Sequence, residues 1–176
     1  MTARRRNLMA AALAGALLLA GASALALDDD PDAPKWNEGE VPPPPAYSQD
    51  GLIDIELPRA RGRSVKIGVA PQTIAVNPQT GIVRYVVVAR GPGAVNASYE
   101  GIRCATAEYR VYARQSAGQP WETVRGSAWQ PLRGQGSAPH PYPLAAGGMC
   151  SGTFVNTPAD AIIRALQSQT GVNRDG

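Results

Sequence analysis

Two cysteines, Cys104 and Cys150, and one histidine, His140, are the side chains of this sequence suited to nucleophilic or redox chemistry. An even cysteine count in an exported protein favours a disulfide, which here closes a loop of 47 residues. The alternative is a thiol enzyme, with either cysteine as the nucleophile and His140 as its base. Such a pair needs contact in space, which the sequence separation neither forbids nor supports. We expect the disulfide.

A second polar group immediately precedes Cys104, in the run from Tyr99 to Arg103. Glu100 and Arg103 are three residues apart, so they would pair in a turn of helix, and Gly101 permits a backbone conformation closed to other residues. One interpretation is a structural turn that fixes Cys104 for its disulfide. The other makes Tyr99, Glu100 and Arg103 a polar cluster that faces a ligand.

Two tryptophans, Trp121 and Trp129, lie within the same loop of the chain. One interpretation places them in the core or at its rim, where large aromatic side chains usually pack. The other makes them a stacking platform for a saccharide or a peptide. Both therefore join the candidate ligand-binding residues.

A cationic segment lies further toward the N-terminus, where Arg59, Arg61 and Arg63 alternate and Lys66 follows. An extended backbone would present the three guanidinium groups on one side. We consider two interpretations: a charged sheet edge that prevents edge-to-edge pairing, and an anion site for phosphate, a lipid headgroup or an acidic polymer. Residues 27–58 hold nine acidic residues against Lys35 alone, so the tether before this segment has the opposite charge.

The total charge and the ligand-type residues exclude some classes of function. The net charge of +3 equals the contribution of Arg4, Arg5 and Arg6, so a nucleic-acid binder is disfavoured. One histidine and no His/Cys cluster at ligand spacing argue against a multi-ligand zinc site, and we expect no metal and no cofactor. The leading function is non-catalytic binding or scaffolding. The alternative is an envelope hydrolase using groups such as Glu100 or Asp54.

The N-terminus has the pattern of a secretory signal peptide in residues 1–26, with three arginines, an apolar run at 8–20 and small residues before Ala24 and Ala26. The arginines are also similar to a twin-arginine signal. No later apolar stretch is long enough to span a bilayer. Residues 27–50, which hold six prolines, are predicted to form an acidic tether. We therefore expect a periplasmic protein whose partner is an envelope protein or an anionic envelope component.

Strands dominate the rest of the chain. Apolar residues alternate at period two in residues 52–57, 65–69, 74–76, 82–89 and 109–114. Three consecutive valines predict that 82–89 is buried on both faces. The turn residues at 77–81 favour a hairpin of 72–77 with 82–89, and 120–124 is the expected partner of 109–114.

One segment near the end has the start signals of a helix. Thr157 is the predicted N-cap, Pro158 the first helical residue, and Gly171 the stop, with Ile162 and Leu166 at helical spacing. The predicted fold class is α+β, a mostly antiparallel β-sheet with a short C-terminal helix, in a single domain over residues 51–170 followed by a tail at 171–176.

The run Tyr99-Glu100-Gly101-Ile102-Arg103-Cys104 carries a resemblance to a known family. With the strand before it, the spaced tryptophans, and a second cysteine ahead of a short helix, the chain resembles the CNP-one-like (CNP1-like) family of exported bacterial proteins. The resemblance covers roughly residues 51–166. It implies a location in the Gram-negative envelope, and it implies no reaction or ligand.

Overall fold

The computed structural model describes residues 36–57 and 65–172, and those from Asn37 onward belong to one compact unit. Four predicted features lie wholly or partly outside the described residues: the signal peptide, the first part of the tether, the tail after Val172, and the cationic segment with Arg59, Arg61 and Arg63. Nothing in the structure therefore bears on the geometry of those segments.

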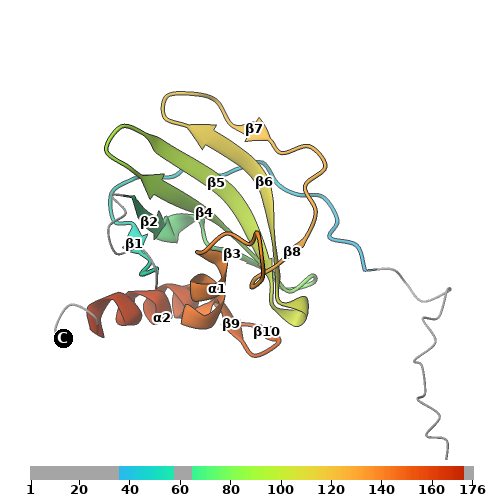
Figure 1. Ribbon diagram of the computed structural model, residues 1–176. Helices are drawn as coiled ribbons and strands as arrows, with labels where there is room; N and C mark the ends of the chain where they lie inside the picture. The colour runs from blue at the N-terminus through green and yellow to red at the C-terminus, as the bar shows by residue number, and fades with distance from the viewer. Residues whose placement is uncertain (1–35, 58–64, 173–176) are drawn as a thin grey trace, which may run out of the picture. The chain divides into compact units, whose positions relative to one another are not determined.

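The main element is a twisted antiparallel sheet with the strand order β1-β2-β4-β5-β6-β7, to which β3 adds beside β4 and β8 beside β6 (Figure 1). Its strands are β1 (Ile53–Asp54), β2 (Lys66–Val69), β3 (Ala75–Asn77), β4 (Ile82–Arg90), β5 (Val95–Arg103), β6 (Glu108–Ser116), β7 (Glu122–Thr123) and β8 (Gln130–Pro131). A separate hairpin joins β9 (Cys150–Ser151) to β10 (Phe154–Val155).

Short helical segments connect these strands. They are η1 (Pro71–Thr73), η2 (Cys104–Thr106), α1 (Pro141–Leu144), η3 (Ala145–Met149) and α2 (Ala159–Val172). In Figure 1, α1 and α2 lie together on one side of the sheet. The structure confirms the predicted α+β class, a mostly antiparallel sheet with a helix near the C-terminus.

Strand β4 is the centre of the sheet, as its sequence predicts. Its residues from Ile82 to Val88 are all buried, because β2, β3 and β5 pair with it and both faces of the sheet are covered. The predicted hairpin with β3 is present in the register Asn77 to Ile82. The pairing of β6 with residues near 122 is present too, although β7 is only two residues long.

The two faces of the sheet have separate apolar cores. We call the first the helix face, because its core includes Tyr85, Ile102 and Tyr109 under residues of α1, η3 and α2. We call the second the segment face, where Val86 and Tyr99 pack with residues of an N-terminal segment, residues 37–48. The sequence predicts a tether for these residues, whereas here they lie against the sheet.

The C-terminal helix differs from its prediction at both ends. It begins at Ala159 rather than Pro158, and it continues through Gly171 to Val172. Its apolar stripe is as expected, since Ile162 and Leu166 are buried in the core of the helix face. Glycine weakens a helix interior by only about 1 kcal/mol relative to alanine, so it does not by itself end one.

The sequence analysis did not predict β5, and this changes the interpretation of residues 99–104. The run from Tyr99 to Arg103 is extended strand, not a turn, and Gly101 does not have a positive φ. Residues three apart on a strand point to opposite faces, so the predicted helical pairing of Glu100 with Arg103 is wrong.

The disulfide is confirmed. Cys104, directly after β5, is bonded to Cys150 at the start of β9, with their Cα atoms 5.6 Å apart. The bridge ties the central sheet to the segment that carries α1 and η3. The thiol-enzyme alternative is therefore wrong for Cys104 and Cys150, because both sulfur atoms are in the bond.

Candidate functional site

A β-bulge in β6 organises the polar groups of the sheet. Tyr99 pairs with Ala113 and Glu100 pairs with Val111, so Tyr112 is an additional residue in β6 at this point. Bulges of this kind re-aim a side chain, and here Tyr112 turns onto the segment face together with Ala113. A strict alternation would have placed neighbours 112 and 113 on opposite faces.

Gly101 makes room for that side chain. A Cβ at Gly101 would collide with the hydroxyl of Tyr112, which lies directly over it. The ring of Tyr99 packs beside Tyr112 at a centroid distance of 5.4 Å. Gly101 is thus required by a close approach, not by the backbone freedom that the sequence suggested.

On the helix face, Glu100 is the centre of a buried hydrogen-bonded group. Its Oε2 accepts a hydrogen bond from the Tyr85 hydroxyl at 3.0 Å and lies 2.8 Å from Nε2 of His140. Tyr85 is fully buried, and the His140 side chain, which precedes α1, is 11% exposed. Glu100 Oε2 thus lies within hydrogen-bond distance of two side chains, the Tyr85 hydroxyl and the His140 ring.

On the segment face, Glu38 is the centre of a second buried group. Its Oε1 accepts hydrogen bonds from Arg84 Nη2 at 2.8 Å and from the Tyr112 hydroxyl. Its Oε2 lies 3.1 Å from Arg110 Nη1. Both guanidinium groups also lie over the Tyr112 ring, 5.7 and 5.5 Å from its centroid. We call Arg84, Arg110 and Tyr112 the arginine site.

Burial and charge shift the titration of these groups. Burial, followed by the charge of Glu100 and the hydrogen bond to it, raises the pKa of Tyr85 well above its ordinary value. Burial and Glu38 raise the pKa of Tyr112 in the same way. Burial acts to lower the pKa of Arg84, but its contacts with Glu38 and Tyr112 outweigh this effect, and the pKa rises. Both tyrosines therefore stay protonated as hydrogen-bond donors.

Arg103 lies at the end of β5, away from Glu100. It donates to Thr106 at 2.6 Å, pairs with Glu108, and lies over the Trp129 ring at 5.2 Å from its centroid. The hydrogen bond from Thr106, aided by Arg103 and opposed by burial, lowers the pKa of Glu108. This group tightens the turn between β5 and β6.

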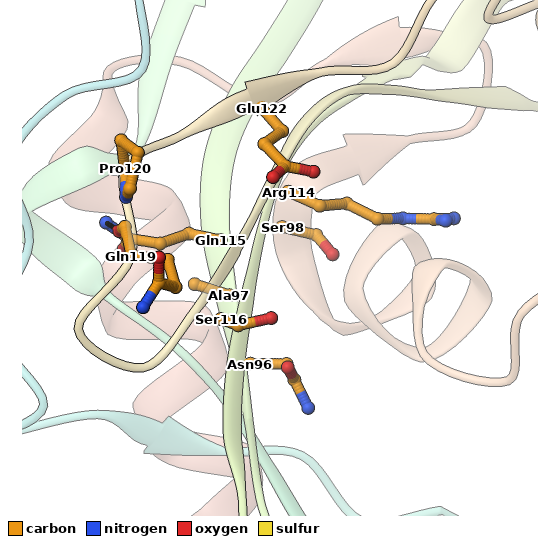
Figure 2. A pocket seen from close by; sticks show the side chains of 9 residues that line it. All are labelled: Asn96, Ala97, Ser98, Arg114, Gln115, Ser116, Gln119, Pro120 and Glu122. Carbon is orange, nitrogen blue, oxygen red and sulfur yellow. Dashed lines mark hydrogen bonds between the residues drawn. The ribbon is translucent and has the colours of Figure 1, made fainter.

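A polar pocket lies at the other end of the same hairpin (Figure 2). It has a volume of about 270 Å³. Its lining comes from β5, β6, the turn after β6 and β7, and consists of Asn96, Ala97, Ser98, Arg114, Gln115, Ser116, Gln119, Pro120 and Glu122. Figure 2 shows Asn96, Ser98, Arg114 and Ser116 projecting to one side of the two strands.

The predicted ligand-binding residues do not form one cluster. Tyr99 packs in the core of the segment face, whereas Glu100 is buried on the helix face. Trp121 contacts the Tyr47 ring edge-on at 5.9 Å, and Trp129 lies with Arg103. Each tryptophan thus packs at the rim of the fold, while a role in ligand binding stays a prediction.

The remaining candidates lie elsewhere. Asp54 forms an ion pair with Arg90 between β1 and β4, so the two carboxylates named for a hydrolase, Asp54 and Glu100, have different partners. Lys66 is exposed on β2, opposite Arg90. It is the described member of the predicted anion site, whose arginines lie outside the described ranges.

The sequence analysis missed Glu38, Arg84, Arg110 and the roles of Tyr85 and Tyr112. One signal was present: Arg84 interrupts an apolar strand predicted to be buried on both faces. A buried guanidinium group requires a partner, so Arg84 was a sufficient signal to expect an acidic side chain from another part of the chain. Which acidic residue it was, 46 positions away, could not be read from the sequence.

Within 36–57 and 65–172, no three His, Cys, Asp or Glu side chains converge in a way that would hold a metal ion. In the same part of the chain, no helix has both the length and the apolar character needed to cross a bilayer.

Comparison with known proteins gives one match. No curated protein and no solved structure matches the chain. A family model, that of the CNP1-like family, matches residues 31–167, a range that contains both polar groups, the pocket and the disulfide. The chain therefore belongs to the CNP1-like family.

Proposed function

We propose that the protein is exported to the periplasm and binds a hydroxyl-rich component of the cell envelope, without catalysis, in the polar pocket of the β5–β6 hairpin. The observation that carries this proposal is the lining of the pocket. It combines alcohol side chains of Ser98 and Ser116 with amides of Asn96 and Gln119. Such groups both donate and accept hydrogen bonds, as the hydroxyls of a saccharide do.

The size and charge of the pocket support a small polar ligand unit. A volume of about 270 Å³ is slightly below the usual range for ligand pockets, which begins at about 300 Å³. Arg114 and Glu122, which face each other across β6 and β7, add one charge of each sign. A pair of opposite charges has no net charge, so it orients a polar ligand but does not favour an anion over a neutral molecule. A neutral sugar unit therefore suits the site better than an anionic one.

The test is a titration of the isotope-labelled mature protein with neutral mono- and disaccharides, followed by NMR. We expect shifts of the amides of Asn96, Ser98, Ser116 and Gln119, reduced in Arg114→Gln. The matched control is Arg125→Gln, an exposed arginine outside the pocket. Shifts that are absent at millimolar sugar, or unchanged in Arg114→Gln, would contradict the proposed site.

Export is tested separately. The basic and apolar N-terminus supports cleavage near Ala24 or Ala26, and the disulfide is in keeping with an oxidising compartment. Intact mass spectrometry of protein recovered from the periplasm should show a chain that lacks residues 1–24 or 1–26. A mass that corresponds to the chain with residues 1–24 still present would contradict the export proposal.

One observation favours a second candidate, the envelope hydrolase. Nε2 of His140 lies 2.8 Å from a buried carboxylate oxygen of Glu100, which is how many enzymes orient a histidine base. In such a mechanism Nδ1 of His140 would accept a proton from water. Chromogenic ester and glycoside substrates test this: wild-type turnover that is lost in folded His140→Gln supports it, and equal background rates contradict it.

A further inference from the structure

The arginine site has more hydrogen-bond donors than its occupant uses. Each guanidinium group contacts Glu38 through one terminal nitrogen. Neither is bidentate, although an arginine pairs most strongly with an oxyanion through two parallel N–H bonds. Among the described residues, the Nε atoms of Arg84 and Arg110 are buried and have no hydrogen-bond partner. A buried donor without a partner destabilises the fold, because it has lost its hydrogen bond to water and gained none in the protein.

The charges at the arginine site are also not balanced. Two arginines contact one carboxylate, Glu38, so the contacts leave one positive charge in excess. The hydroxyl of Tyr112 stays protonated there and donates a further hydrogen bond. A ligand with three or four oxygen atoms and more than one negative charge would match these donors better than a single carboxylate does.

Glu38, which now occupies the arginine site, belongs to a segment that is held on the sheet by side-chain contacts. Val41 and Tyr47 pack on the segment face, and the Tyr47 hydroxyl donates to Gln115 Oε1 at 3.0 Å. Among the described residues, no backbone–backbone hydrogen bond joins 37–48 to the sheet. Residues 42–45 are prolines, which have no N–H to add to a strand ladder. This segment can therefore leave the sheet without breaking a strand ladder.

We propose that the arginine site binds a tetrahedral oxyanion of the phosphate class, and that Glu38 is an intramolecular occupant that this ligand displaces. The phosphoryl oxygens take the donors that Glu38 uses and the two Nε groups that it leaves unpaired. The ligand is either free phosphate or a phosphate monoester on an envelope lipid. Residue Gly101 forms the floor of the site beneath Tyr112, and this explains a glycine within β5.

Competition with Glu38 sets the apparent affinity. A tethered carboxylate acts at an effective concentration of about millimolar or above, so phosphate binds weakly while Glu38 is present. Removing the carboxylate removes the competitor and leaves the arginines in place. The expected consequence is a dissociation constant for inorganic phosphate at least about tenfold lower in Glu38→Ala than in wild type.

The experiment uses the full mature chain and isothermal titration with inorganic phosphate. Wild type, Glu38→Ala and Glu40→Ala are compared, Glu40 being an exposed acid of the same segment. We expect tighter binding in Glu38→Ala alone, and its loss when Arg110→Met is added. Equal binding in all three variants, or binding that survives Arg110→Met, would overturn the proposal.

Two further measurements complete the design. If Glu38→Ala does not fold, as thermal unfolding would reveal, Glu38→Gln keeps the shape and removes the charge, and the same gain is expected. Vesicles that contain a phosphate-monoester lipid separate the two sources of ligand. Binding to free phosphate alone assigns a soluble ligand, binding to vesicles alone assigns a lipid headgroup, and binding to neither overturns the site.

Discussion

Nε2 of His140 lies 2.8 Å from Oε2 of Glu100, although 40 residues separate them in the chain. Glu100 comes from the centre of β5, and His140 immediately precedes α1. The contact therefore fixes the start of the helical layer on the sheet, and the Cys104–Cys150 bridge joins the same two parts of the chain. The pair thus positions α1 and η3.

Glu100→Ala should destabilise the protein strongly. The substitution leaves Tyr85 and His140 without their shared partner in a buried site, and each buried polar group left unsatisfied costs about 1–3 kcal/mol. Urea unfolding followed by circular dichroism measures the change. Glu122→Ala, an exposed carboxylate, is the control and should alter the free energy of unfolding by less than about 0.5 kcal/mol.

Gly101→Ala should destabilise the protein because the new methyl group meets Tyr112. Overpacking of this kind costs about 1–3 kcal/mol. Combining it with Tyr112→Leu should give less than the sum of the two single effects, since the shorter side chain clears the space. Gly93→Ala, with nothing within 4 Å of the new Cβ, is the control. Additive effects in the double variant would contradict the close approach.

Alkaline titration should separate Tyr85 and Tyr112 from the other tyrosines. Their pKa values are raised in the folded state, so their contribution to stability is complete below the ordinary tyrosine pKa of about 10 and is lost as the pH rises through the raised values. Tyrosinate absorbance should show Tyr85 and Tyr112 ionising only with unfolding, after the other four of the six side chains, among which burial also raises the pKa of Tyr47 and Tyr99. Six ionising together before unfolding would contradict both shifts.

Thiol labelling tests the bridge directly. Denatured but unreduced protein should label at neither Cys104 nor Cys150, and two labelled sites would contradict the bond. Replacing both cysteines by alanine should lower the free energy of unfolding by about 2–4 kcal/mol, the usual range for such a loop. Reduction of the wild type should produce a similar loss.

Sequence patterns correctly predicted the elements whose structure depends mainly on residues close to one another in the chain. The valine run of β4, the turn before it, and the apolar stripe of α2 each bury their own side chains, so periodicity alone was sufficient. The bridge followed from cysteine count and compartment. None of these predictions required knowing which distant segment of the chain packs against the element.

Strand β5 was missed because its sequence lacks the composition of a strand. Asn96, Ser98 and Gly101 are poor strand formers, and they occur there because their neighbours require them. Asn96 and Ser98 line a pocket, and Gly101 lies under Tyr112. Pairing with β4 and β6 along the whole strand overrides the local preference.

The candidate sites depend on long-range contacts that spacing cannot reveal. From the sequence, Glu38 is one acid of a predicted acidic, proline-rich tether, and the bulge that brings Tyr112 to it has no sequence signal. In the structure Glu38 pairs with Arg84 and Arg110, which lie on two strands of the sheet. The positions could be found only with the sheet assembled.

The position of Glu38 in the chain imposes an order on folding. The segment that carries it is synthesised first, but its partners Arg84, Arg110 and Tyr112 follow 46, 72 and 74 residues later. Contacts between residues so far apart in sequence form slowly, because a long loop must close before they are made. We therefore expect the sheet to assemble with its arginines uncovered, and residues 37–48 to dock on it afterwards.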